Sequence, residues 1–196
     1  MHIGIFLDRD GTINEEVNYL STPGELHLIP GAADAIREAN RLGLRVFVIT
    51  NQSGIARGVF TEEHLAEVHK HLLQLLKDEH AHIDGIYYCP HHPDFGDGQY
   101  RKDCSCRKPN IGMLTQAARE FDIDLSKSFV VGDRLIDIQT GNNAGATSIL
   151  VLTGYGKEEQ TLLQQHHMHA EHVAGDLYEA VQYIKRSILQ EQTSIS

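Results

Sequence analysis

Short apolar segments that alternate with amphipathic ones restrict the fold of this chain more than any other feature. Buried strands are expected at residues 3–7, 44–49, 83–88, 129–131 and 148–152. Between them, apolar side chains recur every three or four residues, as in helices that cover a core. Helices are expected over residues 30–42, from Thr61, from Pro109, around residues 136–144 and over residues 176–189. This alternation favours a parallel sheet between two layers of helices, a three-layer α/β/α, Rossmann-like fold.

Length, charge and the first residues bound the possible functions. The 196 residues, 41% of them hydrophobic, predict one domain over residues 1–190 and a flexible polar tail over residues 191–196. A net charge of −10 argues against nucleic acid or an anionic membrane as the main partner. No apolar run approaches the ~20 residues of a membrane span, and residues 1–8 lack the basic segment of a secretory signal. We therefore expect a cytoplasmic monomer.

Polar residues follow the predicted strands, at the edge where parallel sheets bind ligands. Asp8 and Asp10 follow the first strand, and two carboxylates so close together favour a hard cation such as Mg²⁺. Hydroxyl and amide groups suited to phosphate follow the second strand: Thr50, Asn51, Gln52 and Ser53. Two cations, Arg107 and Lys108, directly precede Pro109. Two further carboxylates, Asp133 and Asp137, follow the fourth strand. Singly, such groups also form turns, solvated pairs or helix caps. Together, at successive strand ends, they predict a site for a metal and a phosphate.

The three cysteines form a second candidate site. Cys89, Cys104 and Cys106 lie close together in a chain with too few cysteines for a disulfide scaffold. With an imidazole from His91 or His92 they make a Cys₃His set suited to tetrahedral Zn²⁺, the alternative being ordinary free thiols. The residues between the pairs are polar and cannot order themselves by burial. We expect a closed, structural zinc loop over residues 89–106 that fixes the cations directly after it. The remaining histidines, including those at positions 166, 167 and 169, are expected to be structural or surface residues.

Four of these motifs resemble those of the haloacid dehalogenase (HAD) superfamily of phosphohydrolases. The matching residues are Asp8-Arg9-Asp10-Gly11-Thr12, Thr50-Asn51, Lys108, and Gly132-Asp133 with Asp137. Residues 48–58 and the segments 85–93 and 104–109 further resemble the D-glycero-D-manno-heptose 1,7-bisphosphate phosphatases, a family related to the histidinol-phosphate phosphatases. The resemblance implies a HAD fold and favours His91 over His92 as a zinc ligand. No inserted segment is long enough for a large cap domain.

The resemblance also implies a role for each motif residue. Asp8 is expected to be the nucleophile that forms an aspartyl-phosphate, and Asp10 the general acid and base, helped by a pKa nearer the working pH than that of a free carboxylate. Mg²⁺ is expected on Asp8, Asp133 and the main-chain carbonyl of Asp10. Thr50, Asn51 and Lys108 would hold the transferring phosphoryl group. Asp137 either supports the metal site or faces solvent.

A bisphosphate substrate needs a second anion site, for which the fork of Arg107 is the first candidate. The resemblance implies that the loop after the first motif, residues 16–19, and the residue after Asp133 also hold the sugar and its phosphate. Arg134 stands at that last position, where many relatives have lysine. The expected substrate-binding set is Asp8, Arg9, Asp10, Glu16, Val17, Asn18, Tyr19, Thr50, Asn51, Gln52, Ser53, Arg107, Lys108 and Arg134, with Asp8, Asp10, Thr50 and Lys108 catalytic.

The expected function is Mg²⁺-dependent removal of the C7 phosphate from heptose 1,7-bisphosphate, a small-molecule substrate, in nucleotide-activated heptose synthesis for a bacterial surface glycan. Histidinol-phosphate phosphatase is the enzymatic alternative, but Arg107 and Arg134 suit a second phosphate better than a cationic substrate. A phospho-receiver domain shares an acidic pocket, yet it has no use for Asp10 beside Asp8 or for a zinc loop. A zinc-dependent nucleic-acid module conflicts with the negative charge.

Overall fold

A computed structural model describes residues 1–165 and 168–194 of the chain. It contains a parallel sheet of six strands in the order β3-β2-β1-β4-β5-β6. The strands are β1 (Gly4–Leu7), β2 (Arg45–Asn51), β3 (Gly85–Cys89), β4 (Phe129–Gly132), β5 (Thr147–Val151) and β6 (His172–Ala174). The predicted strands are confirmed within two residues at each end. Strand β6 was not predicted, because a three-residue strand leaves no apolar run to recognise.

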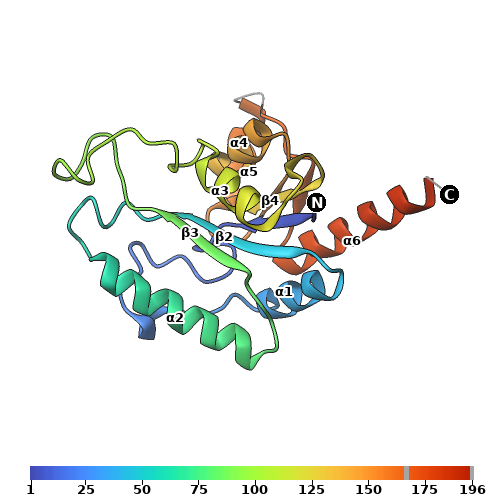
Figure 1. The fold of residues 1–196 in the computed structure, drawn as a ribbon, viewed down its shortest axis with the longest axis horizontal. Helices are drawn as coiled ribbons and strands as arrows, with labels where there is room; N and C mark the ends of the chain where they lie inside the picture. The colour runs from blue at the N-terminus through green and yellow to red at the C-terminus, as the bar shows by residue number, and fades with distance from the viewer. Residues whose placement is uncertain (166–167, 195–196) are drawn as a thin grey trace.

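Helices cover both faces of the sheet, which confirms the three-layer α/β/α fold. They are α1 (Ala32–Arg41), α2 (Glu62–Asp78), α3 (Gly112–Phe121), α4 (Leu135–Ala144), α5 (Gly156–Gln165) and α6 (Leu177–Ser194), with short 3₁₀ turns η1 (Pro23–Glu25) and η2 (Leu125–Lys127). Figure 1 shows α1, α2 and α6 on one side of the sheet and α3, α4 and α5 on the other. Among the described residues, no helix is long and apolar enough to span a membrane.

Alternation along the strands divides the core between the two faces. In β1, Ile5 and Leu7 belong to the core beneath α1, α2 and α6, whereas Phe6 points to the opposite face. There the Phe6 ring stacks on Phe47 of β2 with 5.1 Å between ring centroids, in a cluster that includes Leu114 of α3. Since both faces are covered, the central strands β1 and β4 are apolar throughout rather than alternating with polar residues.

Three helix predictions need correction. Helix α3 begins at Gly112, not at Pro109, because the backbone turns first: Asn110 N–H donates to Arg107 and Gly112 N–H donates to Ser105. Helix α5 was not predicted, since its sequence is mostly polar and Leu163 is its one fully buried apolar residue among those described. Helix α6 continues to Ser194, four residues into the expected tail. Residues 166–167, part of the histidine cluster, and residues 195–196 lie outside the described residues.

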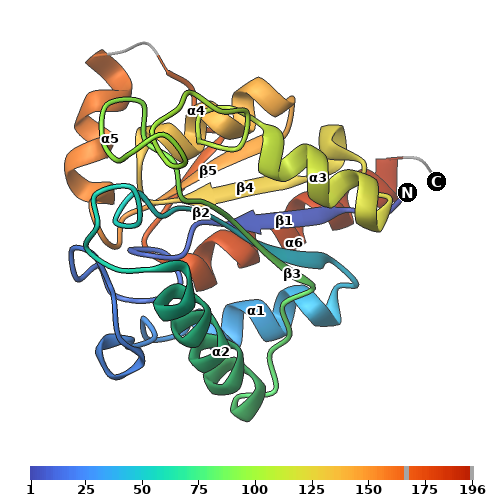
Figure 2. The ribbon, with the colours of Figure 1, turned by 60° about the vertical axis from the view of Figure 1, so that its left-hand side comes forward.

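The order of the strands places a crevice between β1 and β4. The chain adds β2 and β3 on one side of β1, then returns and adds β4, β5 and β6 on the other side. At such a switch point the connections leave the carboxyl ends in opposite directions, which opens a binding site between them. Leu7 lies beside Val131, and the Asp8 N–H donates to the Val131 carbonyl at 2.9 Å. The loops after the strands gather at this end of the sheet (Figure 2).

Candidate active site

Lys108 lies at the centre of the site and contacts two carboxylates. Its Nζ lies 3.0 Å from an oxygen of Asp8 and 2.6 Å from an oxygen of Asp137, and it donates to the Ile49 carbonyl. Lys108 and Asp137 are both buried, so the solvent-facing alternative for Asp137 is wrong. Burial alone would lower the pKa of Lys108, but Asp137 and Asp8 outweigh it and raise that pKa well above its usual value. The lysine is therefore a permanent cation at the bottom of the crevice.

Three carboxylates meet where β1 and β4 end. Oxygens of Asp8, Asp133 and Asp137 lie within 4.8 Å of one another. Burial raises the pKa of Asp8 to about 7, with Lys108 opposing and Asp137 adding to the shift, and raises that of Asp133 to about 8, reinforced by the charges of Asp8 and Asp137. One oxygen of Asp133 accepts from the Tyr155 N–H, while the other is buried without a hydrogen-bond partner. Crowded carboxylates with an unpartnered oxygen fit a divalent cation.

The loop after β1 approaches this cluster closely because it contains glycine. Gly11 has φ +79°, and a Cβ there would lie 2.3 Å from an oxygen of Asp133. No other residue type fits this backbone conformation and this spacing together. The glycine of the first motif therefore lets the loop pack directly against the carboxylate.

Asp10 is held by its neighbours in the ionised form. Arg9 donates Nε and Nη2 to its two oxygens at 3.0 and 2.8 Å, and Asn14 and Gln52 donate one bond each. Burial tends to raise the pKa of Asp10, but Arg9 and these hydrogen bonds outweigh it and lower the pKa below that of a free carboxylate. The expectation of a pKa nearer neutrality is therefore wrong for this state of the protein.

Two of the expected substrate-binding side chains lie elsewhere. The Arg9 side chain is fully buried, paired with Asp10 and against His69, so its guanidinium is not open to a substrate. Val17 is exposed but does not line either pocket described below. The sequence could not reveal the position of Arg9, because an arginine beside two aspartates is as consistent with phosphate binding as with internal pairing.

The second motif positions Lys108 as well as lining the crevice. The Asn51 side chain accepts from the Lys108 N–H at 3.1 Å and donates to the Lys108 carbonyl at 3.2 Å. Thr50 is buried and accepts a hydrogen bond from Gln52. Asn51, at the end of β2, thus holds the backbone of Lys108 in place, although the two residues lie far apart in the sequence.

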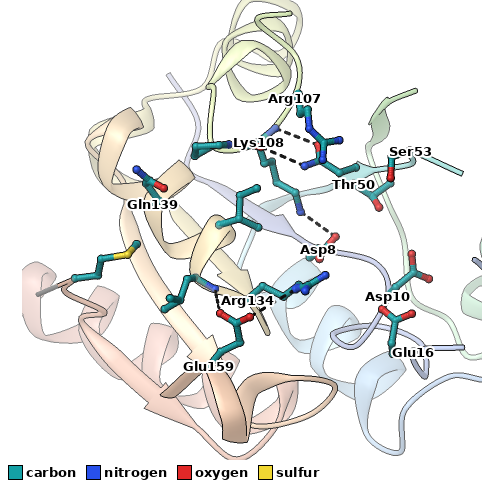
Figure 3. A pocket seen from close by; sticks show the side chains of 15 residues that line it. Asp8, Asp10, Glu16, Thr50, Ser53, Arg107, Lys108, Arg134, Gln139 and Glu159 are labelled. Carbon is teal, nitrogen blue, oxygen red and sulfur yellow. Dashed lines mark hydrogen bonds and ion pairs between the residues drawn. The ribbon is translucent and has the colours of Figure 1, made fainter. Parts of the chain in front are cut away.

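Two adjoining pockets open above Asp8. The first, about 610 Å³, is lined by Asp8, Asp10, Glu16, Thr50, Asn51, Ser53, Arg107, Lys108 and Arg134 among the predicted residues. The second, about 270 Å³, shares several of these and adds Asn18, Tyr19 and Gln52. Figure 3 shows Lys108 reaching Asp8 from one wall and Arg134 extending toward the same space from another. Lining residues that the sequence analysis did not assign to the site include Arg57, His92, Gln139, Tyr155, Glu159 and Met168.

Three arginines line the second pocket, together with the carboxylates of Asp10 and Glu16. Arg107 donates to the His91 carbonyl, and the Arg134 guanidinium lies 4.6 Å above the Tyr155 ring, with Glu159 3.8 Å from its Nε. Arg57, not predicted, lies 3.7 Å above the Phe95 ring. None of the three makes the close bidentate ion pair that Arg9 makes, so their charge remains available to an anion.

The four predicted ligands of the second site come together. The sulfur atoms of Cys89, Cys104 and Cys106 lie 3.1–3.4 Å apart, and His91 Nδ1 lies 3.4 Å from Cys106 Sγ and 3.7 Å from Cys89 Sγ. Tetrahedral Zn²⁺ with ~2.3 Å bonds to sulfur requires ligand separations of roughly 3.7 Å, close to these values. His92 lies outside the set and packs instead on Phe95.

This fold and this arrangement of aspartates, threonine and lysine define the HAD-like hydrolases. A family model described as HAD-hydrolase-like matches residues 105–180. The crystal structure of D,D-heptose 1,7-bisphosphate phosphatase from B. bronchiseptica, complexed with magnesium and phosphate, superposes with a TM-score of 0.82 at 36% identity, covering 97% of this chain and 99% of the other.

Curated relatives narrow the class to one family. The D-glycero-D-manno-heptose-1,7-bisphosphate 7-phosphatase of Chlorobaculum tepidum is 43% identical over 90% of this chain and 91% of its own. The D-glycero-beta-D-manno-heptose-1,7-bisphosphate 7-phosphatase of Escherichia coli K12 is 45% identical over 76% of this chain and 79% of its own. The chain belongs to the heptose-1,7-bisphosphate 7-phosphatase family, which confirms the resemblance drawn from its motifs.

Proposed function

We propose that this protein hydrolyses the C7 phosphate of D-glycero-D-manno-heptose 1,7-bisphosphate and releases the 1-phosphate. The observation that carries the proposal is the 43% identity, over 183 residues, to the Chlorobaculum tepidum protein named for this reaction. The site supports it independently: Asp8 and Lys108 form an inner subsite for one phosphate, and Arg57, Arg107 and Arg134 give the adjoining pocket charge for a second. A substrate with an amine and an imidazole gains nothing from these cations.

In the proposed reaction, a carboxylate oxygen of Asp8 bonds to phosphorus as the bond from phosphorus to the C7 oxygen breaks. Asp10 gives a proton to that oxygen. Because Arg9 keeps Asp10 ionised in the free protein, this proton enters with the substrate, whose phosphate monoester has a second pKa near 6. Asp10 then takes a proton from water, the water oxygen bonds to phosphorus, and Asp8 leaves with its carboxylate restored. Lys108 and Thr50 stabilise the charge on the transferring group.

Two metals complete the proposal. Asp8, Asp133 and the main-chain carbonyl of Asp10 would hold Mg²⁺, which offsets the repulsion between a carboxylate and a phosphate. The unpartnered oxygen of Asp133 supports this assignment. Cys89, His91, Cys104 and Cys106 would hold Zn²⁺ with four protein ligands, which leaves no open position and implies a structural role. Thiols kept reduced as metal ligands are consistent with a cytoplasmic location.

Phosphate release from three substrates tests the proposal. The α and β anomers of heptose 1,7-bisphosphate and histidinol phosphate are each assayed with Mg²⁺ and with EDTA, and ³¹P NMR identifies which phosphate of the heptose is lost. We expect Mg²⁺-dependent loss of the C7 phosphate, with the β anomer preferred because the E. coli relative is named for it. Preferred cleavage of histidinol phosphate, or full activity in EDTA, would overturn the proposal.

A further inference from the structure

A buried histidine of α2 lies behind the pair formed by Arg9 and Asp10. His69 is 8% exposed, and its Nε2 lies 3.1 Å from Arg9 Nη1. Its ring packs at an angle on Tyr88, with 5.9 Å between centroids, and borders an open groove along α2 and β3. None of the sequence motifs includes this residue, and it lines neither of the two pockets above Asp8.

The chemistry of the contact determines the state of the imidazole. A guanidinium carries donors only and stays charged at all ordinary pH values. The contact with Arg9 Nη1 is therefore a hydrogen bond only if His69 Nε2 accepts it, which makes the ring neutral with its proton on Nδ1. Burial and the charge of Arg9 agree with this state, because together they lower the pKa of His69 to about 3.

Two further donors of Arg9, on Nε and Nη2, are directed at the Asp10 carboxylate. Asp10 accepts four side-chain hydrogen bonds, of which Arg9 donates one to each oxygen. The guanidinium is fully buried, so water cannot replace a lost partner without a rearrangement. The orientation of Asp10 thus depends on Arg9, and that of Arg9 depends in turn on the acceptor that His69 provides.

We propose that His69 is a positioning residue for Asp10: its neutral imidazole holds Arg9 in the orientation that aligns the Asp10 carboxylate for proton transfer. The inference rests on the proposed function for the role of Asp10. It does not make His69 catalytic, since Arg9 separates it from the reacting atoms. A residue that merely fills space at this position needs no acceptor nitrogen, and that difference can be measured.

The hydrogen bond is tested first without any assay of activity. In the full-length wild-type protein, ¹⁵N chemical shifts of the histidine side chains report which ring nitrogen carries the proton. We expect His69 to be protonated on Nδ1 alone, between pH 6 and 8. An imidazolium, or a ring protonated on Nε2, would overturn the proposal even if the heptose bisphosphate is hydrolysed as proposed. Conversely, the expected spectrum supports the contact whatever the substrate proves to be.

Kinetics of two variants test the consequence. His69→Leu removes the acceptor, and His69→Gln keeps one in its amide oxygen. We expect His69→Leu to lower kcat about tenfold with KM changed less than about twofold, because a small misplacement of a catalytic group costs up to ~100-fold. His69→Gln should restore kcat to within about threefold of wild type. An unchanged kcat in His69→Leu, or equal losses in both variants, would overturn the proposal.

A variant of the adjacent residue separates positioning from loss of stability. Val68 is buried in the core beneath the sheet, so Val68→Ala weakens the packing of α2 without touching Arg9. Denaturant unfolding of all three variants shows which are comparably destabilised. We expect Val68→Ala to keep the wild-type kcat. A loss of kcat in Val68→Ala that matches that of His69→Leu would contradict a specific role for the imidazole.

Discussion

At the scale of single residues, the site balances several charges that are removed from water together. Lys108 neutralises part of the charge of Asp8 and Asp137, whereas Asp133 accepts from the Tyr155 N–H and, within the part of the chain that the structure describes, forms no ion pair. A divalent cation would balance the remaining negative charge of the carboxylates better than a second lysine, because one ion binds several oxygens at once. Burial and neighbouring carboxylates raise the pKa of Asp8 to about 7 and that of Asp133 to about 8, and a divalent cation would offset this crowding of charge.

Replacement of Asp8 by asparagine is the most direct test of the nucleophile. Asp8→Asn keeps the shape of the side chain but removes the oxygen that attacks phosphorus, so we expect kcat to fall by about 10³-fold or more. The melting temperature should change little, because the variant also relieves repulsion within a crowded acidic cluster. Phosphate release and circular dichroism measure the two effects. Turnover at the native rate would refute covalent catalysis through this residue.

The apparent affinity for Mg²⁺ should depend on pH in a definite direction. In the metal-free protein the pKa values of Asp8 and Asp133 are about 7 and about 8, so both carboxyls bind protons below those values. Since Mg²⁺ must displace these protons, its affinity rises with pH between about 6 and 9 and levels off above. Calorimetry in buffers of different ionisation enthalpy measures the protons released. Asp133→Asn should bind Mg²⁺ weakly at every pH, and a pH-independent affinity in the wild type would contradict the prediction.

At the scale of elements, the cysteine loop and the second motif hold the same stretch of chain from two sides. Cys106 directly precedes Arg107 and Lys108, and the Asn51 side chain contacts both backbone groups of Lys108. Zn²⁺ on the four proposed ligands would fix the first end of this stretch, where the sequence offers few apolar residues for packing. The loop would then act on catalysis through the position of the lysine.

Loss of one thiolate should show this dependence. We expect Cys104→Ser to lose Zn²⁺ and to lower kcat by at least about tenfold, because Lys108 then leaves its place beside Asp8. Ser105→Ala, an exposed neighbour in the same loop, is the matched control and should retain both zinc and activity. Metal content is measured by mass spectrometry alongside phosphate release. Full activity in a zinc-free Cys104→Ser protein would count against the coupling.

At the scale of the whole molecule, topology brings the site together. Asp8 and Asp133 are distant in sequence, yet they are neighbours because β1 and β4 pair at the switch point of the sheet. The loops after β1, β2, β3, β4 and β5 then surround one crevice. Among the described residues, short loops and the start of α5 line this crevice.

The monomeric state remains a prediction. Exposed large apolar side chains are scattered over different elements, with Val59, Leu73 and Tyr178 as examples. Scattered residues of this kind are normal for a monomer, whereas an interface gathers them into a patch. Sedimentation velocity should therefore give a mass near 21.9 kDa across the micromolar range. A concentration-dependent shift to twice that mass would contradict the expectation.

The sequence by itself determined the strands β1–β5, most helices and the motif residues, and it predicted that three cysteines and a nearby histidine come together in the cysteine loop. Local patterns suffice there, since periodicity reflects burial and short motifs keep their chemistry wherever they fold. Only the tertiary structure decided that Arg9 turns inward, that Asp10 is kept ionised, that Asp137 pairs with Lys108, that His69 contacts Arg9, and that Glu159 lines the crevice. Side-chain direction and pKa depend on charges and burial supplied by residues far away in the chain, and no local pattern records those neighbours.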